Sequence, residues 1–303
     1  MERHRVYVLC LKLALLIVAA LSSDSCAVLS MSAKGKQVGT LQTELVNEAS
    51  GIVASRKNPG VLWVHNDSGD LPRIFAIDAK GVLLGIYYVE KAHLQDWEDI
   101  AIGPGPDPNQ DYLYIGDIGD NTAKRLSVIV YRVAEPKVDP NRPIGRAKIG
   151  PAEAIELTYP DGPKDAETLL VDPWNLDIYI ISKRDLFSKV YRAAYPQSTE
   201  KRTTMTHVAT LPWGLAVGGD ISPDGRLVIV RSPFNASIWE RSKGQELQQA
   251  FRGRELKFSL LFEVQGEGIC FEGHGRGFFT ISEGAGAAIN YYGRLSDGGE
   301  SDN

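Results

Sequence analysis

Two short acidic loops of the same form are the residues of this chain best suited to chemistry. They read Asp67-Ser-Gly-Asp70 and Asp117-Ile-Gly-Asp120, and their first residues are 50 positions apart. Carboxylates presented on loops are the ligands that a hard divalent cation such as Ca²⁺ takes. The spacing departs from that of an EF-hand loop, and Asp-Gly turns also cap their own backbone. Metal binding and a purely structural turn are therefore both open interpretations of each loop.

A second repeated pattern consists of short apolar segments, each opened by an acidic or small residue. Their anchors are separated by 48, 69, 52 and 48 residues and are Ile52, Ile100, Leu169, Ile221 and Ile269. A strand-bearing repeat of this length is typical of propeller blades. We therefore expect an all-β fold, a β-propeller with five four-stranded blades. Six blades is the alternative, because the long interval holds residues 136–151, a surface insertion or a degenerate blade.

Runs rich in Val, Ile, Tyr, Phe and Trp follow each anchor and predict the remaining strands. Second strands are expected at residues 61–65, 112–116, 177–182, 226–231 and 277–282, and third strands at 74–78, 128–133, 190–193, 237–240 and 289–292. Fourth strands are expected at 83–89, 154–159, 205–211 and 258–264. The fifth unit lacks a fourth strand, so we expect residues 40–46 to supply it and to close the ring without open edges.

The two repeated patterns are expected to meet on one face of the ring. In a four-stranded blade, the loop from strand two to strand three opens on the same side as the segment entering strand one. The residues predicted to hold a metal ion are Asp67, Asp70, Asp117, Asp120, Glu167 and Glu267. Those predicted to line the funnel or to contact a ligand are Asp96, Glu98, Asp165, Lys183, Arg231 and Glu283. So many carboxylates would raise one another's pKa unless a cation compensated, which predicts Ca²⁺ as the cofactor.

Several single residues have two interpretations each. Lys183 and Arg231 would clamp an anionic group, or would pair with the acids of the ring. Trp97 would stack on a ligand, although packing between blades is favoured for a Trp at the start of a strand. His65 would act as a base or ligand, or would only be hydrogen-bonded. Cys270 lies in an apolar segment and is predicted to be a buried small hydrophobe.

The termini predict an exported protein. Residues 1–27 carry a basic start, an apolar run and small residues suited to cleavage after Ala27, as in a signal peptide. Lipoprotein processing at Cys26 is the less favoured alternative, and no stable membrane span is expected once the signal is removed. Residues 38–295 are predicted to form a single propeller domain, and residues 296–303 a flexible tail. We expect a periplasmic or extracellular monomer.

The composition of the chain and the motifs that it lacks exclude several classes of function. The net charge of −5 and the lack of a basic patch argue against nucleic acid as a partner. The sequence contains no Gly-x-Ser-x-Gly, His-Glu-x-x-His, Gly-x-x-x-x-Gly-Lys or Cys-x-x-Cys pattern. The familiar routes to serine, zinc and nucleotide chemistry are thereby excluded.

Three segments within residues 45–135 resemble a family of exported bacterial β-propeller proteins. They include Asp96-Trp-Glu-Asp-Ile-Ala101 and Tyr112-Leu-Tyr-Ile-Gly-Asp-Ile-Gly-Asp-Asn121, together with residues 63–70. The pattern is also similar to the SdiA-regulated and phytase-like propeller groups. The phytase-like resemblance implies calcium-dependent hydrolysis of phosphate esters, but the motifs are too distant to carry individual residues across.

Three functional hypotheses follow. The first is a secreted propeller whose acidic funnel binds a divalent cation and a small or extended ligand, with no assigned chemistry. The second is a metal-dependent hydrolase of a phosphate ester, another ester or a lactone. The third is a protein-interaction scaffold that uses the rim. The fold does not choose among them, because propellers host all three functions.

Overall fold

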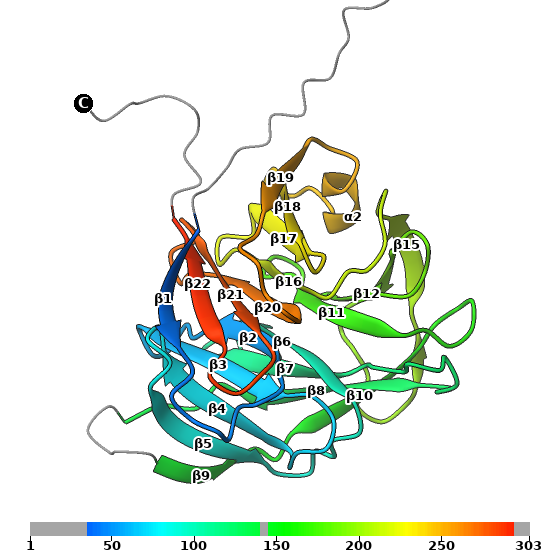
Figure 1. Ribbon diagram of the computed structural model, residues 1–303. Helices are drawn as coiled ribbons and strands as arrows, with labels where there is room; N and C mark the ends of the chain where they lie inside the picture. The colour runs from blue at the N-terminus through cyan, green and yellow to red at the C-terminus, as the bar shows by residue number, and fades with distance from the viewer. Residues whose placement is uncertain (1–34, 140–144, 294–303) are drawn as a thin grey trace, which may run out of the picture. The chain divides into compact units, whose positions relative to one another are not determined.

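Five sheets, each with four antiparallel strands at its centre, form the blades of a β-propeller in the computed structural model (Figure 1). The structure describes residues 35–139 and 145–293, so the predicted signal (1–27) and tail (296–303) lie outside the described residues. Blade 1 contains β2 (Ala49–Ala54), β3 (Val61–Asn66), β4 (Arg73–Asp78) and β5 (Leu83–Val89). Blade 2 contains β6 (Trp97–Pro104), β7 (Asp111–Asp117), β8 (Val128–Ala134) and β10 (Glu153–Thr158).

The last three blades follow the same plan. Blade 3 contains β11 (Ala166–Val171), β12 (Ile178–Ser182), β13 (Lys189–Ala193) and β15 (Thr206–Thr210). Blade 4 contains β16 (Gly218–Ile221), β17 (Leu227–Arg231), β18 (Asn235–Glu240) and β19 (Glu255–Ser259). Blade 5 contains β20 (Gly266–Phe271), β21 (Phe278–Ser282), β22 (Ala288–Tyr292) and β1 (Lys36–Thr40). The prediction of five four-stranded blades is confirmed, and all five apolar anchors are buried.

Two additional strands extend existing blades, and one of them comes from the long interval between the second and third anchors. β9 (Gly145–Ile149) pairs in parallel with β5 at the outer edge of blade 1. β14 (Thr203–Thr204), from the connection in blade 3, pairs in parallel with β10 at the edge of blade 2. Among the described residues no sixth sheet forms, so the insertion covers an edge strand instead of building a blade.

The ring closes with an N-terminal strand, but that strand lies before the predicted one. β1 pairs antiparallel with β22, with Lys36 opposite Tyr291 and Thr40 opposite Ala288. Residues 40–46 were expected to pair, yet the chain leaves the sheet at Thr40. Beyond it, Leu41 and Val46 are buried and Gln42 donates to Gly81 O of blade 1 at 2.9 Å. The predicted strand is therefore mostly a connection that buries the apolar residues at its two ends, Leu41 and Val46.

One outer strand was also predicted too late in the sequence. The fourth strand of blade 4 is Glu255–Ser259, whereas residues 258–264 were expected. A short helix, α2 (Leu247–Ala250), buries Leu247 and Ala250 in the connection before it. The other predicted strands agree with the structure to within two residues at each end.

The innermost strands β2, β6, β11, β16 and β20 contact one another in that order round the ring (Figure 1). Two buried aspartates link neighbouring strands in this inner ring. Asp99 of β6 accepts hydrogen bonds from its neighbour Ile100 N and from Leu169 N of β11, both at 2.9 Å. Asp220 of β16 accepts from Ile221 N at 2.8 Å and from Phe271 N of β20 at 2.9 Å. Each carboxylate thus ties one blade to the next.

Replacing Asp99 by alanine is expected to lower the free energy of unfolding by about 2 kcal/mol, because two buried N–H groups lose their acceptor. Asp78 offers a matched control, since it also accepts two backbone N–H bonds, from Lys80 and Val82, but in an exposed turn that water can reach. Asp78→Ala should therefore cost less than about 1 kcal/mol. Urea-induced unfolding of the two variants measures the difference. Equal losses would show that Asp99 does not link the blades.

Candidate functional site

Seven carboxylates gather at the face where the innermost strands begin. They come from the starts of β6, β11 and β20 and from adjoining loops, and they are Asp67, Asp96, Glu98, Asp165, Glu167, Glu267 and Glu283, here called the acidic mouth. One carboxylate oxygen each of Asp67, Asp96 and Glu98 lies within 4.8 Å of the others. The same holds for Glu98, Asp165 and Glu167. Glu98 belongs to both groups and is the centre of the cluster.

A β-bulge explains why glutamates from three blades point to one place. The pairing register shifts between Trp97 and Asp99, between Ala166 and Thr168, and between Gly266 and Gly268. The extra residue in each shift is a glutamate of the mouth: Glu98, Glu167 and Glu267. A bulge re-aims its side chain away from the ladder, so the same irregularity in three blades turns three carboxylates toward the mouth.

Gly119, in the second acidic loop, makes room for the mouth. A Cβ atom at this position would collide with Glu98 Oε1 and Asp96 Oδ2, so the close approach of these carboxylates requires glycine here. Gly69, the matching glycine of the first loop, has open space around it and a φ of 88°. The two loops therefore share a sequence pattern for different reasons: one glycine forms a turn and the other admits two carboxylates.

Burial and mutual repulsion raise the pKa values of these carboxyl groups. Glu98 is 3% exposed, and burial, followed by the charges of Glu167 and Asp67, holds its pKa well above the usual range. Burial also raises the pKa of Asp96 to about 6, with Asp67 adding to the effect. The pKa values of Glu167, Glu267 and Glu283 rise to about 7, again chiefly through burial. Clustered carboxylates with raised pKa values mark a candidate functional site.

Two cations of the loop after β12 offset part of this charge. Lys183 Nζ pairs with Glu167 and lies 3.8 Å from Glu267 Oε1. Arg184 pairs with Asp165 and also contacts Asn121. Seven carboxylates minus two cations leave five negative charges when all the groups are ionised. Glu167 is 4% exposed, and its Oε2 has no hydrogen-bond partner among the described residues.

Four predicted site residues have local partners of their own. Asp70 pairs with Arg73 at 2.7 Å and accepts from Asn66 at 2.8 Å. Asp117 pairs with Arg125 at 2.7 Å, and the Asp120 carboxylate accepts from Arg125 N at 2.6 Å. The fourth, Arg231, is treated below. Neutralised in this way, Asp70 and Asp117 are poorer candidates for metal ligands than Asp67.

Arg231 forms a buried ion pair outside the acidic mouth. Its guanidinium lies 2.9 Å from Glu263 Oε2 and donates to Gly268 O at 3.0 Å, and neither partner of the pair is accessible to solvent. The predicted alternative of a salt bridge is the one the structure has, although the acid is not one of those named from the repeat. Glu263 precedes the inner strand by several residues and carries no repeat signal. Arg184, by contrast, adjoins the predicted Lys183.

Trp97 and His65 pack between blades 1 and 2. Trp97 is fully buried, donates from Nε1 to His93 O at 2.9 Å and meets the His65 ring edge to face at 5.8 Å, so the favoured packing interpretation is confirmed. His65 is also fully buried, and this burial lowers its pKa to about 4. Its Nδ1 contacts Asn66 O at 2.8 Å, and it is not a member of the acidic mouth. Cys270 is buried in β20, as predicted.

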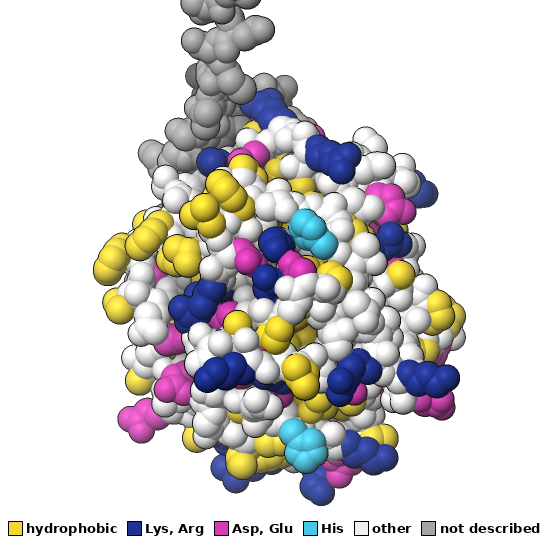
Figure 2. All heavy atoms as spheres, turned by 90° about the vertical axis from the view of Figure 1, so that its right-hand side faces the viewer, with side chains coloured by type: hydrophobic (Ala, Val, Ile, Leu, Met, Phe, Trp, Pro, Cys, Tyr) yellow, Lys and Arg dark blue, Asp and Glu magenta, His cyan; other side chains and the backbone are white. Residues whose placement is uncertain are grey.

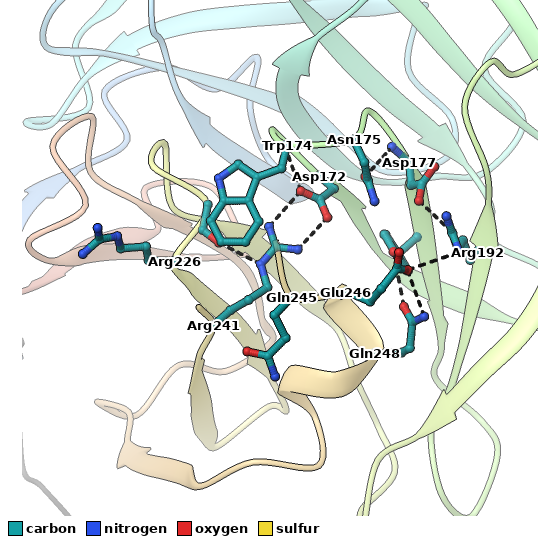
Figure 3. Close-up of polar contacts among 12 residues, drawn as sticks. Asp172, Trp174, Asn175, Asp177, Arg192, Arg226, Arg241, Gln245, Glu246 and Gln248 are labelled. Atoms are coloured by element: carbon teal, nitrogen blue, oxygen red, sulfur yellow. Dashed lines mark hydrogen bonds and ion pairs between the residues drawn. The ribbon is translucent and has the colours of Figure 1, made fainter. Parts of the chain in front are cut away.

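A second polar cluster, drawn in Figure 3, contains Asp172 and Arg241, which follow the ends of β11 and β18 and so lie at the opposite ends of the strands from the acidic mouth. Arg241 binds Asp172 through two hydrogen bonds, at 2.5 and 2.8 Å, and donates to Gly225 O at 2.8 Å. Its guanidinium lies 3.9 Å from the centre of the Trp174 ring. Each nitrogen of the Arg241 guanidinium and each oxygen of the Asp172 carboxylate is hydrogen-bonded, which indicates a structural link between blades 3 and 4.

No protein family model and no curated protein matches this chain. Among solved structures, a nidogen/laminin complex contains a chain with a TM-score of 0.44 and 12% identity, over 78% of this chain and 73% of that one. Hydrazine synthase of Kuenenia stuttgartiensis has a TM-score of 0.42 and 11% identity, over 80% of this chain and 94% of that one. The Pan2 WD40 domain of Neurospora crassa has a TM-score of 0.43 and 9% identity, over 86% of this chain and 97% of that one. These similarities concern the fold alone.

No helix within residues 35–139 or 145–293 is long and apolar enough to cross a membrane.

Proposed function

We propose that this protein is a cation-binding β-propeller that holds a calcium ion at the acidic mouth. The observation that carries the proposal is the position of Glu98, whose carboxylate is shared by two groups of three acids. The unpartnered Oε2 of Glu167, in one of these groups, supports it. Hard oxygen ligands from several loops suit Ca²⁺ better than softer metals.

Lys183 could help to bind a further ligand beside the metal ion. Lys183 is held at the mouth by Glu167 and Glu267, and an ammonium group in that position would attract an oxygen-rich ligand to the bound ion. We also propose that the protein acts after export, as the sequence of residues 1–27 suggests. Outside the cell, calcium modules work at weak affinities, with Kd values of about 10⁻⁴ to 10⁻³ M. Such an affinity fits a mouth already partly neutralised by Lys183 and Arg184.

Calcium added to chelator-treated protein is expected to raise its melting temperature, because a ligand that binds only the native state stabilises that state. At a concentration of 100 Kd the gain is about 2.7 kcal/mol. Glu98→Gln removes the shared ligand and should weaken calcium binding at least tenfold (~1.4 kcal/mol) in a calorimetric titration. Gly119→Ala should weaken it as well, since the new Cβ displaces Glu98 and Asp96.

Two matched variants serve as controls for these substitutions. Glu240→Gln removes an exposed glutamate at the end of β18, and Gly145→Ala adds a Cβ that meets no atom within 4 Å. Both should bind calcium like the wild type. A melting temperature that responds neither to calcium nor to chelator would overturn the proposed function.

A further inference from the structure

Most of the exposed large hydrophobic side chains lie on the same face as the acidic mouth. Of the twelve such residues in the described part of the chain, ten are on loops that open on this face. Seven of the ten lie on loops of blades 3 to 5, and the six most exposed of these, here called the apolar arc, are Leu186, Phe187, Leu215, Phe234, Phe262 and Val264. Leu186 is 83% exposed and Phe262 is 85% exposed. Monomeric proteins rarely expose so many large apolar groups together unless they bind a partner.

The apolar arc adjoins the acidic mouth in the structure. Leu215 donates its backbone N–H to Lys183 O at 3.0 Å, and Lys183 is the cation of the mouth. On the other side, Gln265 follows Val264 and donates to the Glu283 carboxylate at 2.6 Å. In the view of Figure 2, acidic and basic side chains lie side by side near the middle of the molecule, with hydrophobic groups around them. One face therefore offers apolar surface beside unbalanced negative charge.

We infer that the apolar arc and the acidic mouth together bind a polypeptide segment that carries a lysine or arginine next to apolar residues. The apolar side chains of the segment would cover the arc, and its cation would enter the mouth, where seven carboxyl groups face only the two cations Lys183 and Arg184. With a divalent ion bound, the seven carboxyl groups still outnumber the four positive charges of the ion, Lys183 and Arg184, so the attraction persists with calcium present. The inference therefore goes beyond the proposed function and does not depend on it.

Charge selects this occupant over two others. A second copy of the chain, related by a two-fold axis, would set one acidic mouth near the other and repel it. An anionic membrane surface would also be repelled by the mouth. A basic and apolar segment satisfies both parts of the face, since its charge complements the mouth and its side chains bury the arc.

The test is a selection of random dodecapeptides displayed on phage against the whole protein, with chelator and with calcium. Recovered peptides are expected to carry lysine or arginine beside apolar residues. A synthetic copy of the most enriched peptide should bind at least tenfold more weakly to Phe187→Ser/Phe262→Ser. Both of these side chains are exposed, so the fold should be kept, as thermal unfolding would verify. Val82→Ser, at an exposed hydrophobic position outside the arc, should bind like the wild type.

The outcomes separate the inference from the proposed function. Enriched peptides without a basic residue, or unchanged binding to the double serine variant, would overturn the inference. So would self-association, or binding to zwitterionic vesicles, that the double variant abolishes, because either assigns the arc to another occupant. Peptide binding without any calcium response would refute only the proposed calcium site, whereas normal calcium binding without enriched peptides would refute only the inference.

Discussion

Replacing Arg241 by methionine is expected to lower the free energy of unfolding by about 3–5 kcal/mol, because it leaves the buried Asp172 carboxylate without its cation. Neither partner is appreciably exposed, with side-chain exposures of 0% for Arg241 and 1% for Asp172. The guanidinium also covers the Trp174 ring, so its loss removes packing as well as charge (Figure 3). Arg241→Lys should recover only part of the loss, since an ammonium group cannot form the two parallel bonds.

Arg226→Met is the matched control, because Arg226 is 73% exposed and only approaches Asp224, at 3.9 Å. Its cost should be below about 0.5 kcal/mol. The double variant Arg241→Met/Asp172→Leu should be more stable than Arg241→Met alone, since it removes the uncompensated charge. Urea-induced unfolding of the four variants gives these values. A loss in Arg241→Met no larger than in Arg226→Met would show that this pair does not hold blades 3 and 4 together.

The blade plan was readable from the sequence because it depends on local features that repeat. Each inner strand has a buried aliphatic anchor, Ile52 in blade 1 and Leu169 in blade 3 among them, and a β-rich run follows. Because the same pattern occurs five times, the prediction of blades is stronger than any one segment would allow. The family resemblance agrees with the β-propeller fold, and no matching family model adds to it. The sixth-blade alternative arose only from chain length, and pairing of β9 with β5 removes it.

Strand ends at the outer edges were less predictable, because burial there depends on neighbouring blades. The segment from Leu41 to Val46 is apolar at its ends and was expected to pair, but it buries these side chains without a ladder. Phe262 and Val264 extended the predicted fourth strand of blade 4, yet they are exposed. An apolar residue that faces solvent for binding has the same sequence pattern as one that completes a strand.

The positions of the acidic residues of the candidate site were predicted from the repeat, but the ion pairs that they form were not. The glutamates at the bulges follow from the repeat, and the structure brings Glu98 and Glu167 together. Which acids are neutralised depends on how loops fold and which segments meet. Arg125 pairs with Asp117 within one loop, whereas Arg231 pairs with Glu263, which belongs to a later segment of the chain. Nothing in the sequence around either arginine indicates its partner.

The burial of Glu267, together with the neighbouring carboxylates, predicts that Glu267→Gln is more stable than the wild type at high pH when no metal is bound. Burial, with Glu167 adding to it, raises the pKa of Glu267 from 4.5 to about 7. Below pH 4.5 the carboxyl group is neutral in both states and glutamine mimics it, so the two proteins should be equally stable. Above pH 7 the wild type must hold the charge in its folded state, and the contribution of the bound proton is lost. The variant should then exceed the wild type by a free energy of unfolding on the order of 3 kcal/mol.

The difference in unfolding free energy between Glu267→Gln and the wild type reports on Glu267 and not on other titrating groups. His65, whose pKa falls to about 4 on burial, destabilises the fold as pH drops below 6.5 and so opposes the carboxylates. Since His65 is present in both proteins, its effect cancels in the difference. Urea unfolding with chelator at several pH values measures that difference, and the exposed Glu240→Gln should show none. Added calcium should reduce it at high pH, because the ion neutralises the neighbouring acids. A difference that stays constant across pH would mean that the folded protein does not raise the pKa of Glu267.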